Sequence, residues 1–304
     1  MPRNHGTVTY RLARETDVER TYEVMLEAES DLARKLHMST ADLTLPDKPR
    51  AIAARAASLA DFPGRFWVAE DGRTVVGFGI SYLRERHWHL KSLQVVPAYQ
   101  GMGIGGELMR RCASAIPPRS VRSVVSEAIQ PISNALYVRA GMYPRLIVYA
   151  FSGDPAAAVD RSLGAATGTR ATLAERDELD RSVLGYARRD AHRLWRAAIG
   201  DDRLVTARTA GRVVGYGYAA SDGAIGPAIG RSPSDVRAVI GLAMARLAEE
   251  GCASASVLVP GTLRPVVDRL LTSQFRIGAV PLIYMASGPV GGFRLQPFSP
   301  DGVL

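Results

Sequence analysis

The fold is decided by the stretch Leu93-Gln94-Val95-Val96-Pro97-Ala98-Tyr99-Gln100-Gly101-Met102-Gly103-Ile104-Gly105-Gly106-Glu107-Leu108. Its first residues favour a strand, which Pro97 ends because proline cannot donate to a strand ladder. Four glycines follow within six positions, and apolar residues then recur at helical spacing, which predicts the start of a helix. Glycines let a ligand approach the backbone, and the first amides of a helix have no internal partners. Because the helix dipole is positive there, the stretch predicts a site for a phosphate or pyrophosphate.

The spacing of the glycines narrows the kind of phosphate ligand. A P-loop would need Gly-Lys-Ser/Thr at its end, and the dinucleotide fingerprint has no leading glutamine. The pattern Gln100-x-x-Gly103-x-Gly105 after a Val-x-Pro strand end resembles the acyl-CoA loop of the GNAT superfamily of N-acetyltransferases. The resemblance implies that acetyl-CoA, or another acyl-CoA, is the co-substrate, that the loop amides hold its pyrophosphate and that the Val95 backbone pairs with its pantetheine arm. A plain tight turn is the alternative. The cofactor-binding residues expected on this ground are Val95, Gln100, Gly101, Met102, Gly103, Ile104 and Gly105.

A second motif is Asn134-Ala135-Leu136-Tyr137-Val138-Arg139-Ala140-Gly141-Met142. On a helix, Asn134 and Tyr137 share one face because they are three residues apart. The run resembles the GNAT signature Asn-x-x-Ala-x-x-Leu-Tyr-x-x-x-Gly-Phe, shortened between Asn and Tyr and with Met142 in place of Phe. The resemblance implies that Asn134 binds the CoA arm and that Tyr137 is the catalytic acid. A phenol of pKa about 10 can protonate a thiolate whose conjugate acid has a pKa near 8.5. A core aromatic residue is the alternative for Tyr137.

An amine acceptor must lose a proton before it attacks, so a general base is expected. Strand alternation over residues 87–93 puts His87, His89, Lys91 and Leu93 on one side. Several GNAT enzymes carry a Glu or His at the position of His89, whose unperturbed pKa of about 6.5 suits a base. His89 is therefore the second predicted catalytic residue. The alternatives are a purely structural histidine here and Glu127, at the end of the next strand, as the base. A solvated carboxylate without a catalytic role is the other reading of Glu127.

Two segments of the chain repeat at nearly equal offsets: Val75–Gly79 is echoed by Val213–Gly217, and Leu146–Ala150 by Leu282–Ala286. Such repetition predicts two copies of one fold. Strands and helices alternate, so the fold class is α/β, with two GNAT-like mixed-sheet domains in tandem, the second degenerate. The predicted parts are a GNAT acetyltransferase domain at residues 1–152, a linker at 153–169, a degenerate GNAT-like domain at 170–288 and an irregular C-terminal tail at 289–304.

The second copy lacks both motifs. In place of the glycine loop it has Gly230-Arg231-Ser232-Pro233-Ser234, where Ser232 reads as the cap of a helix. Val267 and Leu270 stand opposite Asn134 and Tyr137 when the two copies are aligned. We therefore expect the first half to carry the chemistry and the second to support it. A separate ligand at the helix that begins after Ser232 is the alternative.

Composition bounds the classes of function. The chain has 304 residues, 47% hydrophobic and 22% charged, and a net charge of +8 that is spread without a Lys/Arg block, which predicts no nucleic-acid partner. There is no apolar signal segment and no stretch long enough to cross a membrane, which predicts a cytoplasmic protein without a membrane partner. No cluster with metal-ligand spacing and no Gly-x-Ser-x-Gly elbow occur, so neither a metal site nor a serine hydrolase is expected.

Together these patterns predict an N-acetyltransferase that moves an acetyl group directly from acyl-CoA to an amine. The expected acceptor is a small-molecule amine, with a protein N-terminus or lysine as the second choice. The second half is expected to replace the partner subunit that many single-domain relatives recruit, which leaves a monomer or a homodimer. The alternative from another class is a non-catalytic acyl-CoA sensor or scaffold, which would bind CoA without turnover.

Overall fold

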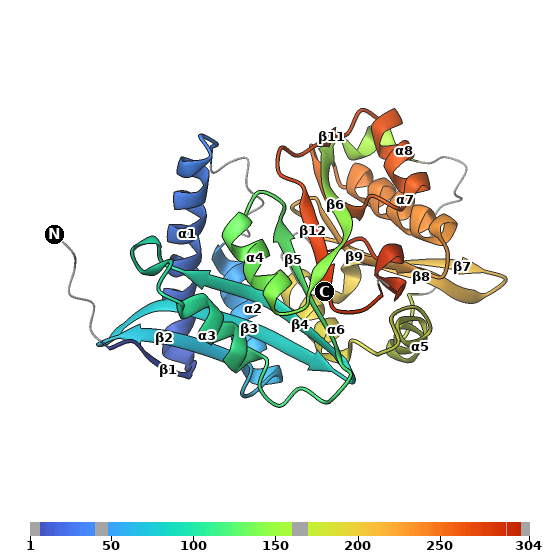
Figure 1. The fold of residues 1–304 in the computed structure, drawn as a ribbon. Coiled ribbons are helices and arrows are strands. Elements are labelled where there is room, and N and C mark those ends of the chain that lie inside the picture. The colour runs from blue at the N-terminus through green and yellow to red at the C-terminus, as the bar shows by residue number, and fades with distance from the viewer. Residues whose placement is uncertain (1–6, 40–47, 160–169, 290, 299–304) are drawn as a thin grey trace. The chain divides into compact units, whose positions relative to one another are not determined.

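The computed structural model describes residues 7–39, 48–159, 170–289 and 291–298 (Figure 1). By their contacts the residues form two compact units. The first unit comprises residues 1–125 and 136–142, and the second comprises residues 126–135 and 143–304. The predicted α/β fold class is confirmed, because each unit contains parallel and antiparallel neighbouring strands together with helices.

The first unit is built on a sheet with the strand order β1-β2-β3-β4-β5. The first four strands are antiparallel neighbours, and β4 and β5 are parallel. Its elements are β1 (Thr9–Leu12), α1 (Val18–Lys35), α2 (Lys48–Asp61), β2 (Phe66–Asp71), β3 (Thr74–Arg84), β4 (His87–Val95), α3 (Ile104–Cys112) and β5 (Val121–Glu127), followed by α4 (Pro131–Arg139), which continues from the second unit into the first.

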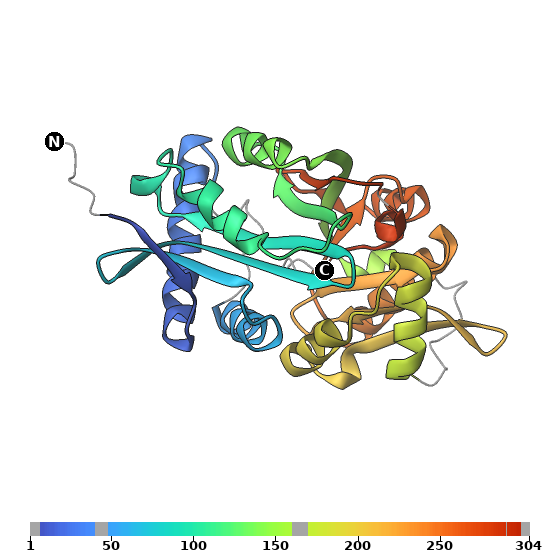
Figure 2. The same cartoon turned by 60° about the horizontal axis from the view of Figure 1, so that its bottom comes forward.

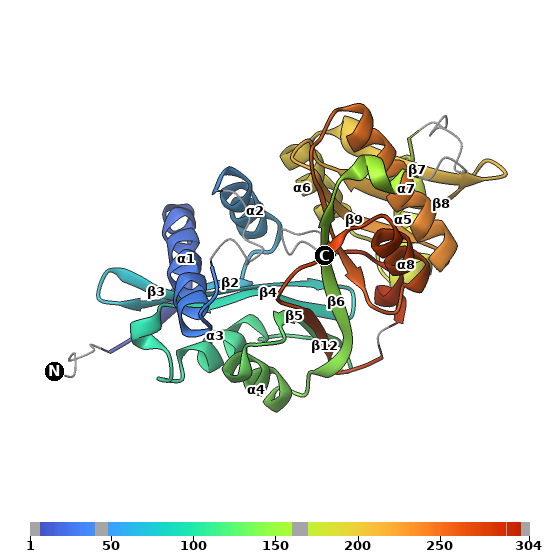
Figure 3. The same ribbon diagram turned by 90° about the horizontal axis from the view of Figure 1, so that it is seen from above.

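Helices cover both faces of this sheet, with α1 and α2 on one face and α3 on the other (Figure 3). On the α3 face, Trp88 of β4 donates its indole N–H to the carbonyl of Cys112 at 3.0 Å. On the opposite face, Lys91 donates to Ser58 Oγ of α2 at 2.9 Å, and Gln94 donates to Glu29 of α1 at 2.8 Å. The apolar residues of β4 therefore face α3, whereas its polar residues face α1 and α2.

One bulge changes the predicted alternation along β4. Ile80 of β3 pairs with Ser92, but the next residue, Ser81, pairs with Leu90, so Lys91 is an extra residue. Leu93 lies on the α3 face beside Gly79, whereas Lys91 contacts α2. The prediction that these two residues share a face is wrong, because an unpaired residue shifts the period-two alternation beyond it.

The second unit repeats the plan with the strand order β12-β6-β10-β9-β8-β7, and β11 also pairs with β6. Its elements are β6 (Tyr143–Gly153), α5 (Leu173–Leu184), α6 (Arg189–Ile199), β7 (Leu204–Thr209), β8 (Arg212–Ala219), β9 (Ala224–Gly230), α7 (Pro233–Glu249), β10 (Ala255–Pro260), α8 (Arg264–Thr272), β11 (Arg276–Ile277) and β12 (Leu282–Ala286). The antiparallel pair β7 and β8 is the golden hairpin of Figures 1 and 2.

The boundary between the units differs from the predicted one at residue 152. We expected β6 to be the last strand of the first domain, but it pairs in antiparallel fashion with β10 and β12 and belongs to the second unit. The described part of the predicted linker contains a short 3-10 turn at Pro155–Ala158, and residues 160–169 lie outside the described residues.

The C-terminal tail is not irregular over the residues that the structure describes. After a 3-10 turn at Gly291–Leu295, Gln296 and Phe298 are fully buried. Phe298 and Phe293 both stack on the ring of Tyr284. Burial of these aromatic side chains holds the segment against the unit, which the Gly/Pro-rich composition did not reveal.

No helix in the described part of the chain combines the length and apolar character needed to span a membrane. The same residues contain no group of three or more His, Cys, Asp or Glu side chains arranged to hold a metal ion.

Candidate active site

The glycine loop has the predicted form of a strand, a turn and a helix. A 3-10 turn at Pro97–Tyr99 follows β4, and α3 begins at Ile104. Gly101 and Gly103 both have φ of +80°, a left-handed conformation that only glycine adopts without strain. Gly103 is the N-cap of α3 and offers no side chain to the amides of the first turn. The amides of this turn therefore face outward without a capping group, as an anion site requires.

The next two glycines leave space above the same turn. A Cβ built on Gly105 would meet Leu136 at 3.9 Å and Val95 at 4.0 Å, and a Cβ on Gly106 would meet Leu136 at 3.8 Å. These are ordinary van der Waals distances, so the packing of the protein does not itself require glycine at either position. Bare backbone at this place fits a ligand that approaches the amides closely, and a diphosphate is such a ligand.

Two arginines offset a negative charge in the first turn of α3. Glu107 lies in the first turn of α3, where its charge would oppose a phosphate. Arg110 and Arg111 donate hydrogen bonds to its carboxylate and lower the pKa of Glu107, outweighing the smaller effect of burial. The carboxylate is thereby neutralised locally, which preserves the positive potential of the helix N-terminus.

Val95 lies at an open edge of β4. Val96 donates to Val76 at 2.9 Å, so the neighbouring pair of Val95 and Gly77 is not hydrogen-bonded, and the Val95 amide and carbonyl point away from β3. On that side, the pairing of β4 with β5 ends at Leu90. The Val95 carbonyl accepts a hydrogen bond from the Gln100 side chain at 2.9 Å. Gln100 thus ties the loop to the strand through a carbonyl that we expected a pantetheine arm to use.

The remaining loop residues differ in exposure. Met102 is 47% exposed at the tip of the loop, whereas the side chain of Ile104 is buried. Both enter the predicted site only through their backbone amides, so the two side chains are not expected to touch a ligand in the same way.

The second motif forms α4 as predicted. Asn134 donates from Nδ2 to the carbonyl of Glu127 at 3.1 Å, and its buried Oδ1 has no hydrogen-bond partner among the described residues. Tyr137 is only 5% exposed. The preceding residue, Leu136, is the side chain nearest to Gly105 and Gly106. Within the first unit, Tyr137 therefore follows directly on the residue of α4 that borders the loop.

His89 lies in a buried polar cluster with His87 and Ser123. Ser123 Oγ is 2.8 Å from His89 Nδ1 and 2.6 Å from His87 Nε2, and the His89 ring stacks on Tyr82. Burial lowers the pKa of His87 to about 3 and lowers the pKa of His89 well below its ordinary value. His89 is 2% exposed, and this burial favours its neutral form. This environment is that of a satisfied core histidine, the structural alternative that the sequence left open.

The pKa of Glu127, the alternative base, is shifted in the opposite direction from the pKa of His89. Burial raises the pKa of its carboxyl above the ordinary value. A carboxylate with a raised pKa is a stronger base, and it is better matched to a proton transfer near neutral pH.

The sequence analysis did not identify two polar residues, one on α1 and one on α2, whose side chains bond to β4. Glu29 is buried and accepts the hydrogen bond from Gln94, and Ser58 accepts one from Lys91. The signal for Glu29 was available, since it continues the helical stripe of Tyr22 and Met25 and places a carboxylate on the apolar face of a predicted helix.

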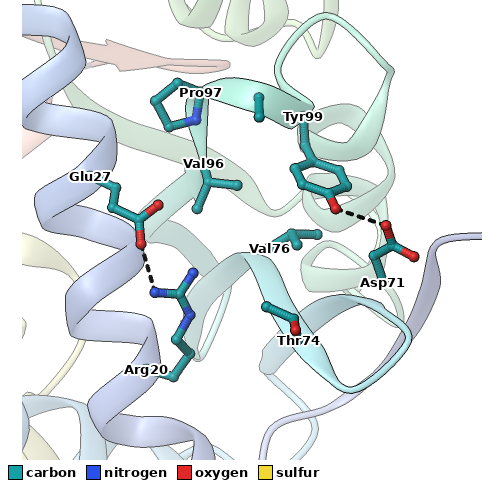
Figure 4. A pocket seen from close by; sticks show the side chains of 9 residues that line it. Arg20, Glu27, Asp71, Thr74, Val76, Val96, Pro97 and Tyr99 are labelled. Atoms are coloured by element: carbon teal, nitrogen blue, oxygen red, sulfur yellow. Dashed lines mark hydrogen bonds and ion pairs between the residues drawn. The ribbon is translucent and has the colours of Figure 1, made fainter. Parts of the chain in front are cut away.

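An open cleft of about 740 Å³ borders the start of the loop on its α1 side. Figure 4 shows the Arg20–Glu27 ion pair on one side and the hydrogen bond from Tyr99 to Asp71 on the other. Its polar side chains are thus engaged with one another, and it contains none of the predicted catalytic residues.

In the second unit the corresponding helix start is closed by its own residues. Ser232 Oγ accepts a hydrogen bond from the Asp235 amide at 3.2 Å. A Cβ on Gly230 would come within 2.6 Å of the Val236 amide nitrogen, so α7 lies directly against β9. The site predicted as an alternative at Ser232 is an ordinary capped helix.

The second unit also contains a buried polar cluster between α5, α6 and β8. The Arg188 guanidinium binds the Asp180 carboxylate through two bonds, at 3.0 and 2.9 Å, and Tyr216 donates to the same carboxylate at 2.5 Å. Burial alone would raise the pKa of Asp180, but Arg188 holds it well below its usual range. The cluster therefore keeps a charged pair inside the unit.

Comparison with known families and curated proteins gives a match to one family model. Residues 30–142 match the model of the acetyltransferase (GNAT) family. No curated protein sequence matches the chain significantly.

Several solved structures are similar over both units. A proposed acetyltransferase from Pyrococcus horikoshii has a TM-score of 0.68 at 16% identity and covers 95% of this chain and 92% of its own. A GCN5-related N-acetyltransferase from Sphaerobacter thermophilus has a TM-score of 0.56 at 16% identity, covering 92% of this chain and 95% of its own. A glucosamine N-acetyltransferase region of a fungal multi-domain GH3 β-N-acetylglucosaminidase has a TM-score of 0.60 at 14% identity, covering 92% of this chain and 38% of that one. At these identities the likeness is one of fold.

Proposed function

Residues 30–142 are a GNAT acetyltransferase domain, and from this premise we propose that the chain transfers an acyl group, acetyl first of all, from acyl-CoA to an amine in a ternary complex. The observation that carries the proposal is the uncapped first turn of α3. There Gly103 is left-handed and Gly105 and Gly106 expose bare backbone beside the open edge of β4. A diphosphate on the amides of residues 100–105 would extend its pantetheine arm along Val95.

Acyl-CoA supplies the activated thioester, and the chain supplies position and proton transfer. Tyr137 donates its phenolic proton to the departing sulfur, a transfer that is uphill by about 1.5 pKa units for unperturbed groups and therefore needs the hydroxyl in contact with the sulfur. Asn134 offers its unpartnered Oδ1 to an amide N–H of the arm.

The acceptor ammonium must give one proton to a base before its nitrogen attacks. His89 is the base that the sequence predicts, but its lowered pKa makes it a weak base near pH 7. Glu127 is the competing candidate, and its raised pKa favours it as the stronger base. If His89 is the base, a substitution of His89 should abolish activity, and if Glu127 is the base, a substitution of Glu127 should do so.

We propose a small-molecule amine as the acceptor, with a protein N-terminus or lysine as the second choice. The buried carboxylate of Glu29 on the α1–α2 face supports a cationic acceptor. We also propose that the chain acts as a monomer or homodimer, without nucleic acid or membrane as partner.

Replacing Tyr137 by phenylalanine tests the mechanism. With acetyl-CoA and a panel of amines, Tyr137→Phe should lower kcat by about 10²- to 10⁴-fold and leave the Kd for acetyl-CoA nearly unchanged. The matched control is Tyr143→Phe, at a tyrosine that is 54% exposed, which should keep the parent rate. Equal rates for Tyr137→Phe and the parent would remove Tyr137 from the mechanism. Binding of acetyl-CoA without turnover of any amine would favour the non-catalytic sensor.

A further inference from the structure

Both units contain a pair of parallel strands that separate part of the way along. In the first unit, β4 and β5 are paired from His87 with Val121 to Leu90 with Val124. In the second unit, β9 and β10 are paired only where Ala224 meets Ser256 and Ile225 meets Val257. Each pair then continues as two separate strands, which leaves a split between them.

The backbone around the two splits corresponds residue by residue. In the first unit Gly77 pairs with Val95 and Gly79 with Leu93. In the second unit Gly215 pairs with Gly230 and Gly217 with Ala228, and Arg231 donates to Val214 as Val96 donates to Val76. By the same geometry as at Val95, the amide and carbonyl of Ala228 point away from β8 and into the split.

In the second unit the split is filled by Pro297 and Phe298. The Ala228 amide of β9 donates to the carbonyl of Pro297 at 3.1 Å. On the other side, the amide of Phe298 donates to the carbonyl of Leu258 of β10 at 2.8 Å, in an antiparallel bridge. Two residues of the tail thus span the gap and give a hydrogen-bond partner to each strand.

The side chain of Phe298 anchors this segment, since it is 1% exposed and stacks on Tyr284. Gln296 is also buried, but its side-chain Nε2 and Oε1 have no hydrogen-bond partner among the described residues. The segment from Gln296 to Phe298 is therefore an integral part of the second unit, in contrast to the irregular tail that its composition predicts.

We propose that the split between β9 and β10 is a slot for an extended, amide-bearing chain, and that its permanent occupant is the protein's own segment Gln296–Phe298. This plug takes the place in the second unit that the pantetheine arm takes in the first, a comparison that rests on the proposed function. The plug excludes acyl-CoA from the second unit, so each chain carries one acyl-CoA, and it joins β9 to β10.

Hydrogen exchange of the Ala228 amide tests the plug directly. The variant ends at Leu295 and lacks the plug, and the matched control ends at Phe298 and keeps it. In the full chain and the control the Ala228 amide should be protected, and in the chain ending at Leu295 it should exchange at least about tenfold faster. Equal protection with and without the plug would overturn the proposal. If the shorter chain does not fold, the full chain still decides, because unprotected exchange at Ala228 contradicts the plug.

Titration calorimetry with acetyl-CoA gives the second test. One acetyl-CoA per full chain is the expected stoichiometry, and two per chain would overturn the plug. No binding at all would overturn the proposed function, while the exchange of Ala228 would still decide the plug independently.

Discussion

Replacing Gly105 by alanine should have opposite effects on the stability of the protein and on its affinity for acyl-CoA. A Cβ at this position would lie 3.9 Å from Leu136 and 4.0 Å from Val95, at ordinary contact distances. Alanine is favoured over glycine inside a helix by about 0.8–1.0 kcal/mol, so the free energy of unfolding should rise by up to that amount. For a domain of 150–250 residues, about 1 kcal/mol corresponds to a rise in Tm of about 2–4 °C.

The same methyl group should weaken the binding of acyl-CoA. The methyl group would lie between Leu136 and Val95, beside the amides on which the proposed function places the diphosphate. A hydrogen bond to a charged group is worth about 1.5–3 kcal/mol, so the loss of one such bond raises Kd by about 10- to 150-fold. The substitution should therefore stabilise the protein and weaken its ligand binding at once.

Thermal unfolding without ligand and calorimetry with acetyl-CoA measure the two effects in the same preparation. Gly103→Ala is the matched control, because its φ of +80° makes alanine cost about 1–2 kcal/mol of stability. That control should lose stability, whereas Gly105→Ala should not. Parent affinity for acetyl-CoA in Gly105→Ala would refute the placement of the diphosphate, and a lowered Tm would refute the packing argument.

Three further predictions concern titratable groups. If Glu127 is the base, Glu127→Gln should abolish turnover and kcat/KM of the parent should fall as pH drops through the raised pKa of this carboxyl; full activity in the variant would leave His89 as the base. Below pH 6.5 the free energy of unfolding should decrease by about 1.4 kcal/mol per pH unit for each of His87 and His89. The reason is that burial lowers the pKa of both residues in the folded chain, to about 3 for His87, so that only the unfolded chain takes up these protons. Urea titrations that give the same free energy at pH 5 and pH 7 would contradict this. Arg188→Met should cost about 3–5 kcal/mol by leaving Asp180 buried without its partner, and adding Asp180→Leu should recover part of that loss in thermal unfolding.

The glycine loop could be predicted from the sequence because its conformation is encoded locally. Pro97 ends the strand, and glycine at residues 101 and 103 permits the left-handed backbone that the turn adopts. The repeat of Val75–Gly79 at Val213–Gly217 likewise predicted two similar strands, and the segments lie in β3 and β8, each of which pairs in antiparallel fashion with the preceding strand.

Other features depend on contacts between distant residues and could not be predicted in this way. The bulge at Lys91 arises from the register of β3 against β4, which the sequence of one strand does not contain. The burial of His89 depends on Ser123, which lies on another strand. The plug at Phe298 needs a gap between β9 and β10, and the composition of the tail gives no sign of it.

The pairing of β6 determines how this polypeptide could be divided. A cut at the sequence repeat, after residue 152, would leave an N-terminal fragment whose last strand has lost both neighbours, β10 and β12. Unpaired strand edges promote aggregation, and the C-terminal fragment would lack an interior strand of its sheet. A crossover between relatives at the turn before Tyr143 would keep β6 with the strands that it pairs with, whereas a crossover ten residues later would separate it from them, although the later point looks like the natural boundary between the two copies.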